Sequence, residues 1–160
     1  MRWKTYGATT AAVTATALLG STAVSTGDDW YRSLSKPPWQ PPSWAFGAAW
    51  TPLYVSIAWA AGHALLEARG RERRTLAVSL GANLALNLAW SHVFFGLRSA
   101  KAGTAATVLL DISNADLLGR TARVDTAAAV ALIPYAAWCG FATALNADIA
   151  VRNRRGAATG

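Results

Sequence analysis

The chain has 160 residues, enough for one domain, and 53% of them are hydrophobic while only 14% are charged. A soluble domain carries about 25% charged residues, so the composition argues against one. The net charge of +7 does not indicate a nucleic-acid partner, because the basic residues flank apolar runs and form no stripe along one face. Cys139 is the only cysteine, which excludes an intrachain disulfide and a cysteine-based metal cluster.

Five apolar segments follow one another along the chain, each close to the roughly 20 residues that cross a bilayer. They predict an all-α integral membrane protein, a single domain over residues 1–160 built as a five-transmembrane-helix bundle. The segments cover about 6–24, 43–66, 75–97, 102–118 and 126–151. Basic breaks at 67–74, 98–101 and 119–125 separate the last four, as expected where a chain meets the membrane border.

The first segment has two interpretations. Met1 to Lys4, followed by an apolar run, is similar to a signal peptide with a cleavage region near 21–25. The run is threonine-rich and longer than the apolar part of a usual signal peptide, so we favour a retained first helix. Orientation is not determined, because the positive-inside rule would have to separate eight basic residues on one side from seven on the other.

The stretch from Trp30 to Trp59 holds five of the eight tryptophans and five of the six prolines. Its first part, up to Pro42, contains two proline pairs that fix backbone angles, so no helix runs through them. A stiff aromatic loop that leads directly into a membrane-length helix is typical of a lid over a binding site, whereas a linker would be polar. The predicted lid residues are Trp30, Arg32, Lys36, Pro37, Pro41 and Pro42.

Three of the predicted helices each place large aromatic residues on one face. At helical spacing, these faces carry Phe46, Trp50, Leu53 and Ile57; Asn83, Asn87, Trp90 and Phe94; and Tyr135, Trp138, Ala142 and Leu145. Tyr54 lies one turn past Trp50, and Pro52 kinks the helix beside it. The convergence of these faces predicts an apolar pocket with few polar anchors. Aromatic packing and interhelical hydrogen bonds between the amides remain the alternative.

The fourth segment is unusually polar. Asp111 lies near its middle, where a carboxylate is costly, so we weigh a ligand role equally against burial within the bundle or a subunit contact. His63 and His92 lie near opposite ends of antiparallel helices, so no metal site is expected. We predict no required cofactor and find no nucleophile–base pair, which leaves no confident catalytic residue.

Three motifs in register over nearly the whole chain resemble the TspO/MBR family of tryptophan-rich sensory proteins and mitochondrial translocator proteins (peripheral-type benzodiazepine receptors). They read WYRSLSKPPWQPPSWAFGAAWTPLY, LALNLAWSHVFFGLRSA and IPYAAWCGFATALN. The resemblance implies five membrane helices, often a homodimer, and a pocket closed by the first loop. It also implies binding of porphyrins such as protoporphyrin IX, and in some members of sterols and benzodiazepine-type ligands.

Carried over position by position, the resemblance makes Trp50 and Trp138 pocket tryptophans linked to porphyrin binding and to light-dependent porphyrin breakdown. These two are therefore the candidates for any catalytic role. The predicted ligand-binding set is Trp39, Trp44, Phe46, Trp50, Tyr54, Asn83, Asn87, Trp90, Phe94, Tyr135, Trp138, Ala142 and Leu145. Sterol binding is doubtful, because no tyrosine separates Leu145 from Arg152 as the proposed sterol motif requires.

The sequence therefore predicts a multi-pass protein, expected in a bacterial cell membrane, that binds porphyrins or related hydrophobic ligands and regulates tetrapyrrole or stress responses. The first alternative is a light- and oxygen-dependent porphyrin-degrading activity through the pocket tryptophans. The second is a transporter, which is the weakest of the three because the chain shows no inverted repeats or paired broken helices.

Overall fold

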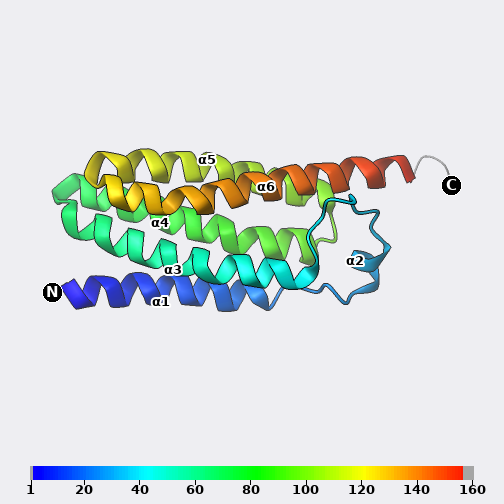
Figure 1. The fold of residues 1–160 in the computed structure, drawn as a ribbon, viewed down its shortest axis with the longest axis horizontal. Helices are drawn as coiled ribbons and strands as arrows, with labels where there is room; N and C mark the ends of the chain where they lie inside the picture. The colour runs from blue at the N-terminus through cyan, green and yellow to red at the C-terminus, as the bar shows by residue number, and fades with distance from the viewer. Residues whose placement is uncertain (1, 157–160) are drawn as a thin grey trace.

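The computed structural model describes residues 2–156 and, in side-chain detail, residues 2–154. This part of the chain is all-helical, with five long helices and one short one (Figure 1). The elements are α1 (Arg2–Ser21), α2 (Asp29–Ser33), α3 (Ser43–Glu67), α4 (Gly70–Ser91), the π-helical turn η1 (His92–Gly96), α5 (Ala100–Val124) and α6 (Thr126–Gly156). The predicted all-α fold is therefore confirmed for these residues.

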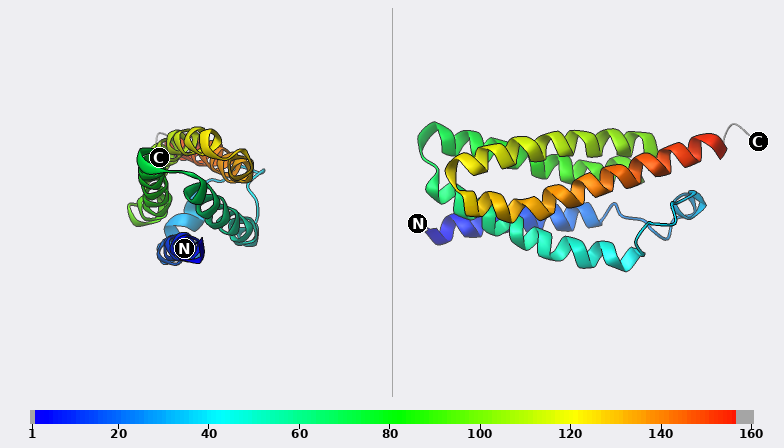
Figure 2. Two further views of the ribbon diagram at one scale, coloured as in Figure 1. Left: turned by 90° about the vertical axis from the view of Figure 1, so that its left-hand side faces the viewer. Right: turned by 45° about the horizontal axis from the view of Figure 1, so that its top comes forward.

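The five long helices run side by side and form a ring in the order α1, α3, α6, α5, α4, each packed against its neighbours (Figures 1 and 2). The N-terminus, the α3–α4 turn and the α5–α6 turn lie at one end of the bundle. The segment 22–42, which contains α2, lies at the other end together with the η1–α5 turn and the C-terminal part of α6. We call these the N-terminal end and the loop end.

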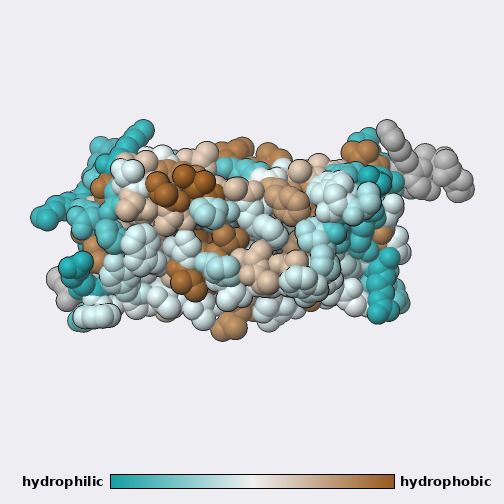
Figure 3. Space-filling model, viewed as in Figure 1, coloured by the Kyte–Doolittle hydropathy of each residue, from teal (hydrophilic) through white to brown (hydrophobic). Residues whose placement is uncertain are grey.

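The surface is hydrophilic mainly at the two ends and paler or hydrophobic between them (Figure 3). Among the described residues, one helix is by length and composition apolar enough to cross a membrane, over residues 126–154, with a mean hydropathy of 1.6. Large hydrophobic side chains are exposed along the other helices as well, among them Val55, Val78 and Ile112. An apolar belt between two polar ends is the pattern that a bilayer imposes on a helix bundle.

Helix extends into two of the predicted breaks. We expected breaks at 67–74 and 119–125, but α4 begins at Gly70 and α5 continues to Val124, so that Asp125 alone separates it from α6. Arginine and glutamate are good helix formers, so a charged stretch ends the apolar span without ending the helix. Gly70 adopts a φ of +51°, which allows the tight reversal from α3 into α4.

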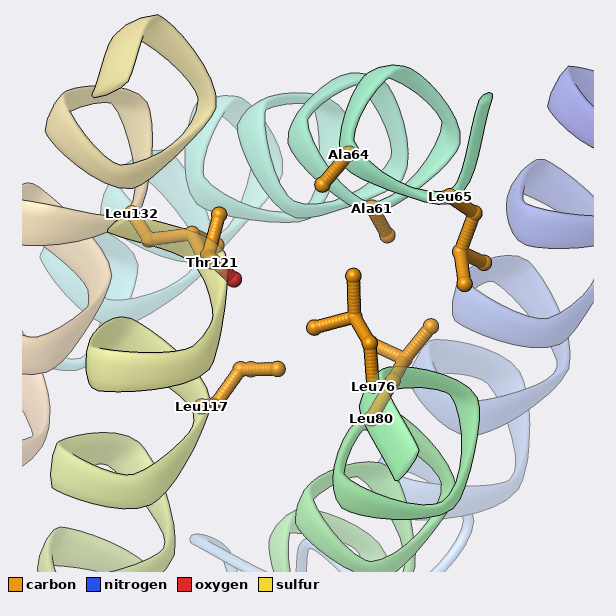
Figure 4. Close-up of a pocket in the computed structure, with 8 residues that line it drawn as sticks. All are labelled: Ala61, Ala64, Leu65, Leu76, Leu80, Leu117, Thr121 and Leu132. Atoms are coloured by element: carbon orange, nitrogen blue, oxygen red, sulfur yellow. The ribbon is translucent and has the colours of Figure 1, made fainter. Parts of the chain in front are cut away.

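The bundle is closed at the N-terminal end by aliphatic packing of α3, α4, α5 and α6. A small cavity of about 10 Å³ remains there (Figure 4). Its lining is apolar except for Thr121: Ala61, Ala64, Leu65, Leu76, Leu80, Leu117, Thr121 and Leu132. This is roughly the room that one water needs, and an apolar void of that size offers a water too few polar partners. A ligand site must therefore lie elsewhere.

Candidate functional site

A cavity of about 420 Å³ opens between the helices at the loop end. Its walls come from α1, α3, α4, η1 and α6, and the segment 22–42 closes it. The lining residues are Ala17, Gly20, Ser21, Val24, Thr26, Tyr31, Gln40, Ser43, Phe46, Gly47, Trp50, Tyr54, Asn87, Trp90, Ser91, Phe94, Phe95, Leu145, Asn146 and Ile149. None of them is charged, so the cavity suits the uncharged part of a ligand.

Two stacked aromatic pairs form opposite walls of the cavity. On α3 the ring of Trp50 stacks on that of Tyr54, with centroids 5.2 Å apart and planes inclined by 25°. Between α4 and η1 the ring of Trp90 stacks on that of Phe94 at 6.0 Å and 29°. Each pair is separated by four residues, the spacing that brings side chains together on one helix face.

The π-helical turn brings a second aromatic ring to the same wall. Phe95 lines the cavity beside Phe94, and both belong to η1. Their rings meet edge to face at 4.9 Å. Single π-helical turns inside α-helices are frequent at functional sites. Phe94 was predicted to contact a ligand, whereas Phe95 was not among the predicted residues.

Three side chains of the cavity lining carry a buried polar atom without a hydrogen-bond partner among the described residues. These atoms are the indole Nε1 of Trp90, the amide Oε1 of Gln40 and the amide Oδ1 of Asn146. Leaving such an atom unpaired costs about 1–3 kcal/mol. Trp90 and Gln40 thus carry an unpaired donor and an unpaired acceptor, whereas Asn146 Oδ1 lies against Gly103 of α5.

From the cavity wall into the interior of the bundle, a chain of hydrogen bonds links α3, α4, α6 and α5. The Tyr54 hydroxyl donates to Asn87 Oδ1 at 3.4 Å, and Asn87 Nδ2 donates to the Tyr135 hydroxyl oxygen at 3.1 Å. The Tyr135 hydroxyl donates to Asn83 Oδ1 at 2.9 Å, and Asn83 Nδ2 donates to Asn114 Oδ1 at 2.8 Å. The two amides of α4 thus differ in position. Asn87 makes interhelical bonds and also lines the cavity, whereas Asn83 makes only interhelical bonds, which was the alternative to a ligand-binding role.

The cavity gathers seven of the predicted ligand-binding residues, namely Phe46, Trp50, Tyr54, Asn87, Trp90, Phe94 and Leu145. Six others do not line it. Asn83 and Tyr135 lie deeper in the bundle, and Ala142 lies beside the site on α6. Trp138 packs behind Phe46, with ring centroids 6.0 Å apart. Trp44 is 75% exposed, and Trp39 lies outside the cavity against Phe141 of α6, with ring centroids 5.8 Å apart.

The lid contacts the cavity through two residues that we had not singled out, Tyr31 of α2 and Gln40 between the proline pairs. They are joined by a hydrogen bond from Gln40 Nε2 to the Tyr31 hydroxyl at 3.1 Å. Burial raises the pKa of Tyr31, so this hydroxyl stays protonated. Gln40 could have been predicted from the sequence, because it is a polar residue in a stretch of prolines and tryptophans.

The predicted lid residues support the lid from outside the cavity. Trp30 packs edge to face on Phe94 at 5.4 Å. Lys36 donates to the Tyr31 backbone oxygen and lies 4.4 Å above the Tyr31 ring. Burial lowers the pKa of Lys36. Pro37 is buried and Pro41 half-buried, while Arg32 and Pro42 are exposed.

Hydrogen bonds fasten the lid to α6. Trp39 Nε1 donates to Asp148 Oδ2 at 3.2 Å. The Ser35 amide donates to Asn153 Oδ1 at 2.9 Å, and Asn153 Nδ2 donates back to the Ser35 carbonyl at 3.1 Å. We call Asp148 and Asn153 the latch. Both belong to α6, so the lid closes against a single helix.

The remaining polar candidates lie outside the cavity lining. Asp111 on α5 accepts a hydrogen bond from the Thr143 hydroxyl of α6, which fixes these two helices together. His63 Nδ1 lies 2.8 Å from Asp125 Oδ2 at the N-terminal end. A hydrogen bond from the Ala128 amide, with the nearby His63, lowers the pKa of Asp125. His92 is exposed at the start of η1.

Comparison with known proteins supports the resemblance. The TspO/MBR family profile matches residues 8–152. A tryptophan-rich sensory protein of Cereibacter sphaeroides is 38% identical over 120 residues, covering 74% of this chain and 73% of that protein. The tryptophan-rich protein TspO of Chlorobaculum tepidum is 38% identical over 136 residues, covering 81% and 84%. The human translocator protein is 38% identical over 122 residues, covering 73% and 70%. The chain therefore belongs to the TspO/MBR family of membrane proteins.

Proposed function

We propose that the protein crosses the membrane with its five long helices and binds a porphyrin, or a similarly flat and apolar molecule, in the cavity at the loop end. Binding of this ligand would make it a sensor for tetrapyrrole or stress responses. The relatives named sensory protein and translocator protein support a membrane sensory or binding role of this kind. The homodimer implied by the resemblance is part of the proposal, with exposed Val108, Leu109 and Ile112 on α5 facing lipid or a second copy.

The observation that carries the proposal is the aromatic cavity itself. Its volume of about 420 Å³ falls in the usual range of small-molecule sites. Trp50 and Trp90 present ring faces on which a flat conjugated ligand stacks, and aromatic contacts of this kind contribute about 0.5–1.5 kcal/mol beyond burial. The unpaired Nε1 of Trp90 and Oε1 of Gln40 would pair with an acceptor and a donor at the ligand edge.

The charge distribution limits how an acidic porphyrin would lie. Because the lining is uncharged, carboxylates would stay at the mouth rather than enter the cavity. The basic residues of the lid are Arg32 and Lys36. Lys36 is held by Tyr31, so the exposed Arg32 is the better partner in the closed lid.

A titration with protoporphyrin IX, followed by its absorbance, tests the proposal. Trp50→Ala removes one stacking surface, and we expect the Kd to rise about tenfold, equivalent to about 1.4 kcal/mol. Trp44→Ala is the matched control, because this exposed tryptophan lies outside the cavity and its loss should leave the Kd unchanged. Equal effects of the two substitutions would refute binding in this cavity.

A second experiment tests the lid. The double variant Asp148→Ala/Asn153→Ala removes the latch, so porphyrin should associate and dissociate several times faster by stopped-flow absorbance. Asp116→Ala is the control. Asp116 pairs with Arg120 on α5 as Asp148 pairs with Arg152 on α6, but Asp116 does not touch the lid. Unchanged rates in the latch variant would show that the lid does not control entry.

Light-dependent porphyrin degradation is a second candidate, favoured by the position of Trp50 in the cavity wall. Trp138 lies behind Phe46, so the two tryptophans are not equivalent. Under illumination in air with bound protoporphyrin IX, Trp50→Phe should slow bleaching more than Trp138→Phe. If both variants and the double variant bleach the pigment at the wild-type rate, degradation through these tryptophans is excluded.

A further inference from the structure

A second hollow, of about 470 Å³, lies apart from the cavity, in the seam between α1 and α4 toward the N-terminal end. The two helices begin at the same end of the bundle and run in the same direction (Figure 1). Ala8 and Ala12 on α1 face Ala77 and Leu80 on α4, with Leu65 of α3 also in the lining. Small side chains on both helices leave an apolar groove open along the outside of the bundle.

Both walls of this groove change from a cation to apolar residues in the same direction. On α1 the row is Lys4, Ala8 and Ala12, and on α4 it is Arg73, Ala77 and Leu80. The spacings of three and four residues keep each row on one helix face. At 1.5 Å per residue the α1 row is about 12 Å long. The groove is therefore cationic at the N-terminal end and apolar toward the middle of the molecule.

Neither cation has an ion-pair partner in the part of the chain that the structure describes. Lys4 and Arg73 are exposed, and the contact of Arg73 across the seam is a long hydrogen bond to the Thr5 hydroxyl at 3.5 Å. The nearest acidic residues in sequence, Glu67 and Glu72, are exposed and take no part in the lining. Arg73 also lies in the first turn of α4, where the helix dipole favours negative charge.

We propose that this groove binds one anionic phospholipid, with the phosphate between Lys4 and Arg73 and an acyl chain along Ala8 and Ala77. The inference goes beyond ligand binding at the loop end and rests only on the membrane placement of the bundle. A soluble anion would leave the apolar floor exposed to water. A second copy of the chain packed on this groove would place like positive charges close together. An anionic lipid has a phosphate to pair with the two cations and an acyl chain to cover the apolar floor.

The test titrates the purified full-length protein in detergent with dioleoyl-phosphatidylglycerol or dioleoyl-phosphatidylcholine and counts bound lipid by native mass spectrometry. The wild type should bind the first phosphatidylglycerol in preference to phosphatidylcholine. Lys4→Gln/Arg73→Gln should weaken that first binding about thirtyfold, about fivefold for each cation near the headgroup, and abolish the preference. Equal binding of the two lipids by the wild type would overturn the proposal.

A matched control separates the groove from general attraction to a basic surface. Arg71→Gln/Arg74→Gln also removes two charges from the start of α4, but these side chains line a different hollow, next to Asp116. This variant should keep the preference, and an equal loss in both double variants would overturn the proposal.

A third variant tests the acyl chain. Ala77→Phe fills the exposed floor without changing charge and should weaken binding of phosphatidylglycerol severalfold. Unchanged binding, or displacement of the lipid by excess inorganic phosphate, would contradict an acyl chain in the groove. Protoporphyrin titrations of the same variants should match the wild type, because the groove and the cavity share no residue. A chain that binds lipid and no porphyrin would refute only the proposed function.

Discussion

The substitution Tyr135→Phe tests the hydrogen-bond chain that supports the cavity. Tyr135 is 1% exposed, and its hydroxyl donates to Asn83 and accepts from Asn87. Phenylalanine keeps the ring and its edge-to-face contact with Trp50 at 6.1 Å, so the packing is preserved. The change therefore isolates the hydroxyl, and it leaves one amide oxygen of Asn83 and one amide hydrogen of Asn87 without their partner.

The expected cost follows from these two lost bonds. Hydrogen bonds between membrane helices contribute about 0.6 kcal/mol on average and up to about 1.7 kcal/mol. Two bonds at 2.9 and 3.1 Å give a loss of about 1–3 kcal/mol in the free energy of unfolding. Thermal unfolding in detergent, followed by intrinsic fluorescence, should show a lower Tm. Because Asn87 then loses an orienting partner at the cavity wall, the Kd for protoporphyrin IX should also rise.

Tyr54→Phe is the matched control for this substitution. It removes the same group, but the Tyr54 hydroxyl makes one long bond of 3.4 Å to Asn87 and the residue is only partly buried. We expect its effect on Tm to be the smaller of the two. A Tm for Tyr135→Phe equal to that of the wild type, or above that of Tyr54→Phe, would refute the role of the chain in stability.

Two further predictions concern packing and a helix cap. A Cβ on Gly103 would lie 2.5 Å from the ring of Phe94, so Gly103→Ala should displace that ring and lower the Tm, whereas Gly81→Ala meets open space and should raise it. Melting curves that shift in the same direction would contradict this. Because the folded pKa of Asp125 is lowered by the Ala128 amide, its contribution to stability is present at neutral pH and is lost as the pH falls below about 4. Asp125→Asn should therefore show a smaller loss of Tm on acidification than the wild type, and superimposable pH profiles would exclude this role.

Much of the site could be predicted from the sequence because helical periodicity is a local property. The four-residue spacing placed Trp50 with Tyr54 and Trp90 with Phe94, and both pairs stack in the structure. The same periodicity does not report depth within the bundle. Asn83 is on the same face as Trp90 but is turned into contact with α5 and α6.

The lid was harder to predict in detail. Its prolines excluded a long helix, and they are followed by α3 as expected, but the short helix α2 before them was not foreseen. Tyr31 and Gln40 reach the cavity because an irregular segment folds back over it, and an irregular segment has no periodicity from which the facing residues can be read. Trp39 was expected to contact ligand and instead bonds Asp148 on α6, a residue more than a hundred positions away.

The sequence by itself determined the all-helical fold, the membership of the TspO/MBR family and the helix faces that carry large aromatic residues. These properties depend on composition, on motifs and on a repeat of 3.6 residues, all of which are contained in short stretches of chain. Only the tertiary structure decided that Trp50 lines the cavity while Trp138 lies behind Phe46, and that the π-helical turn adds Phe95. A cavity lies where neighbouring helices are not packed tightly against each other. The position of that gap along each helix is determined by contacts between residues that are distant in sequence, so a helix face alone does not reveal it.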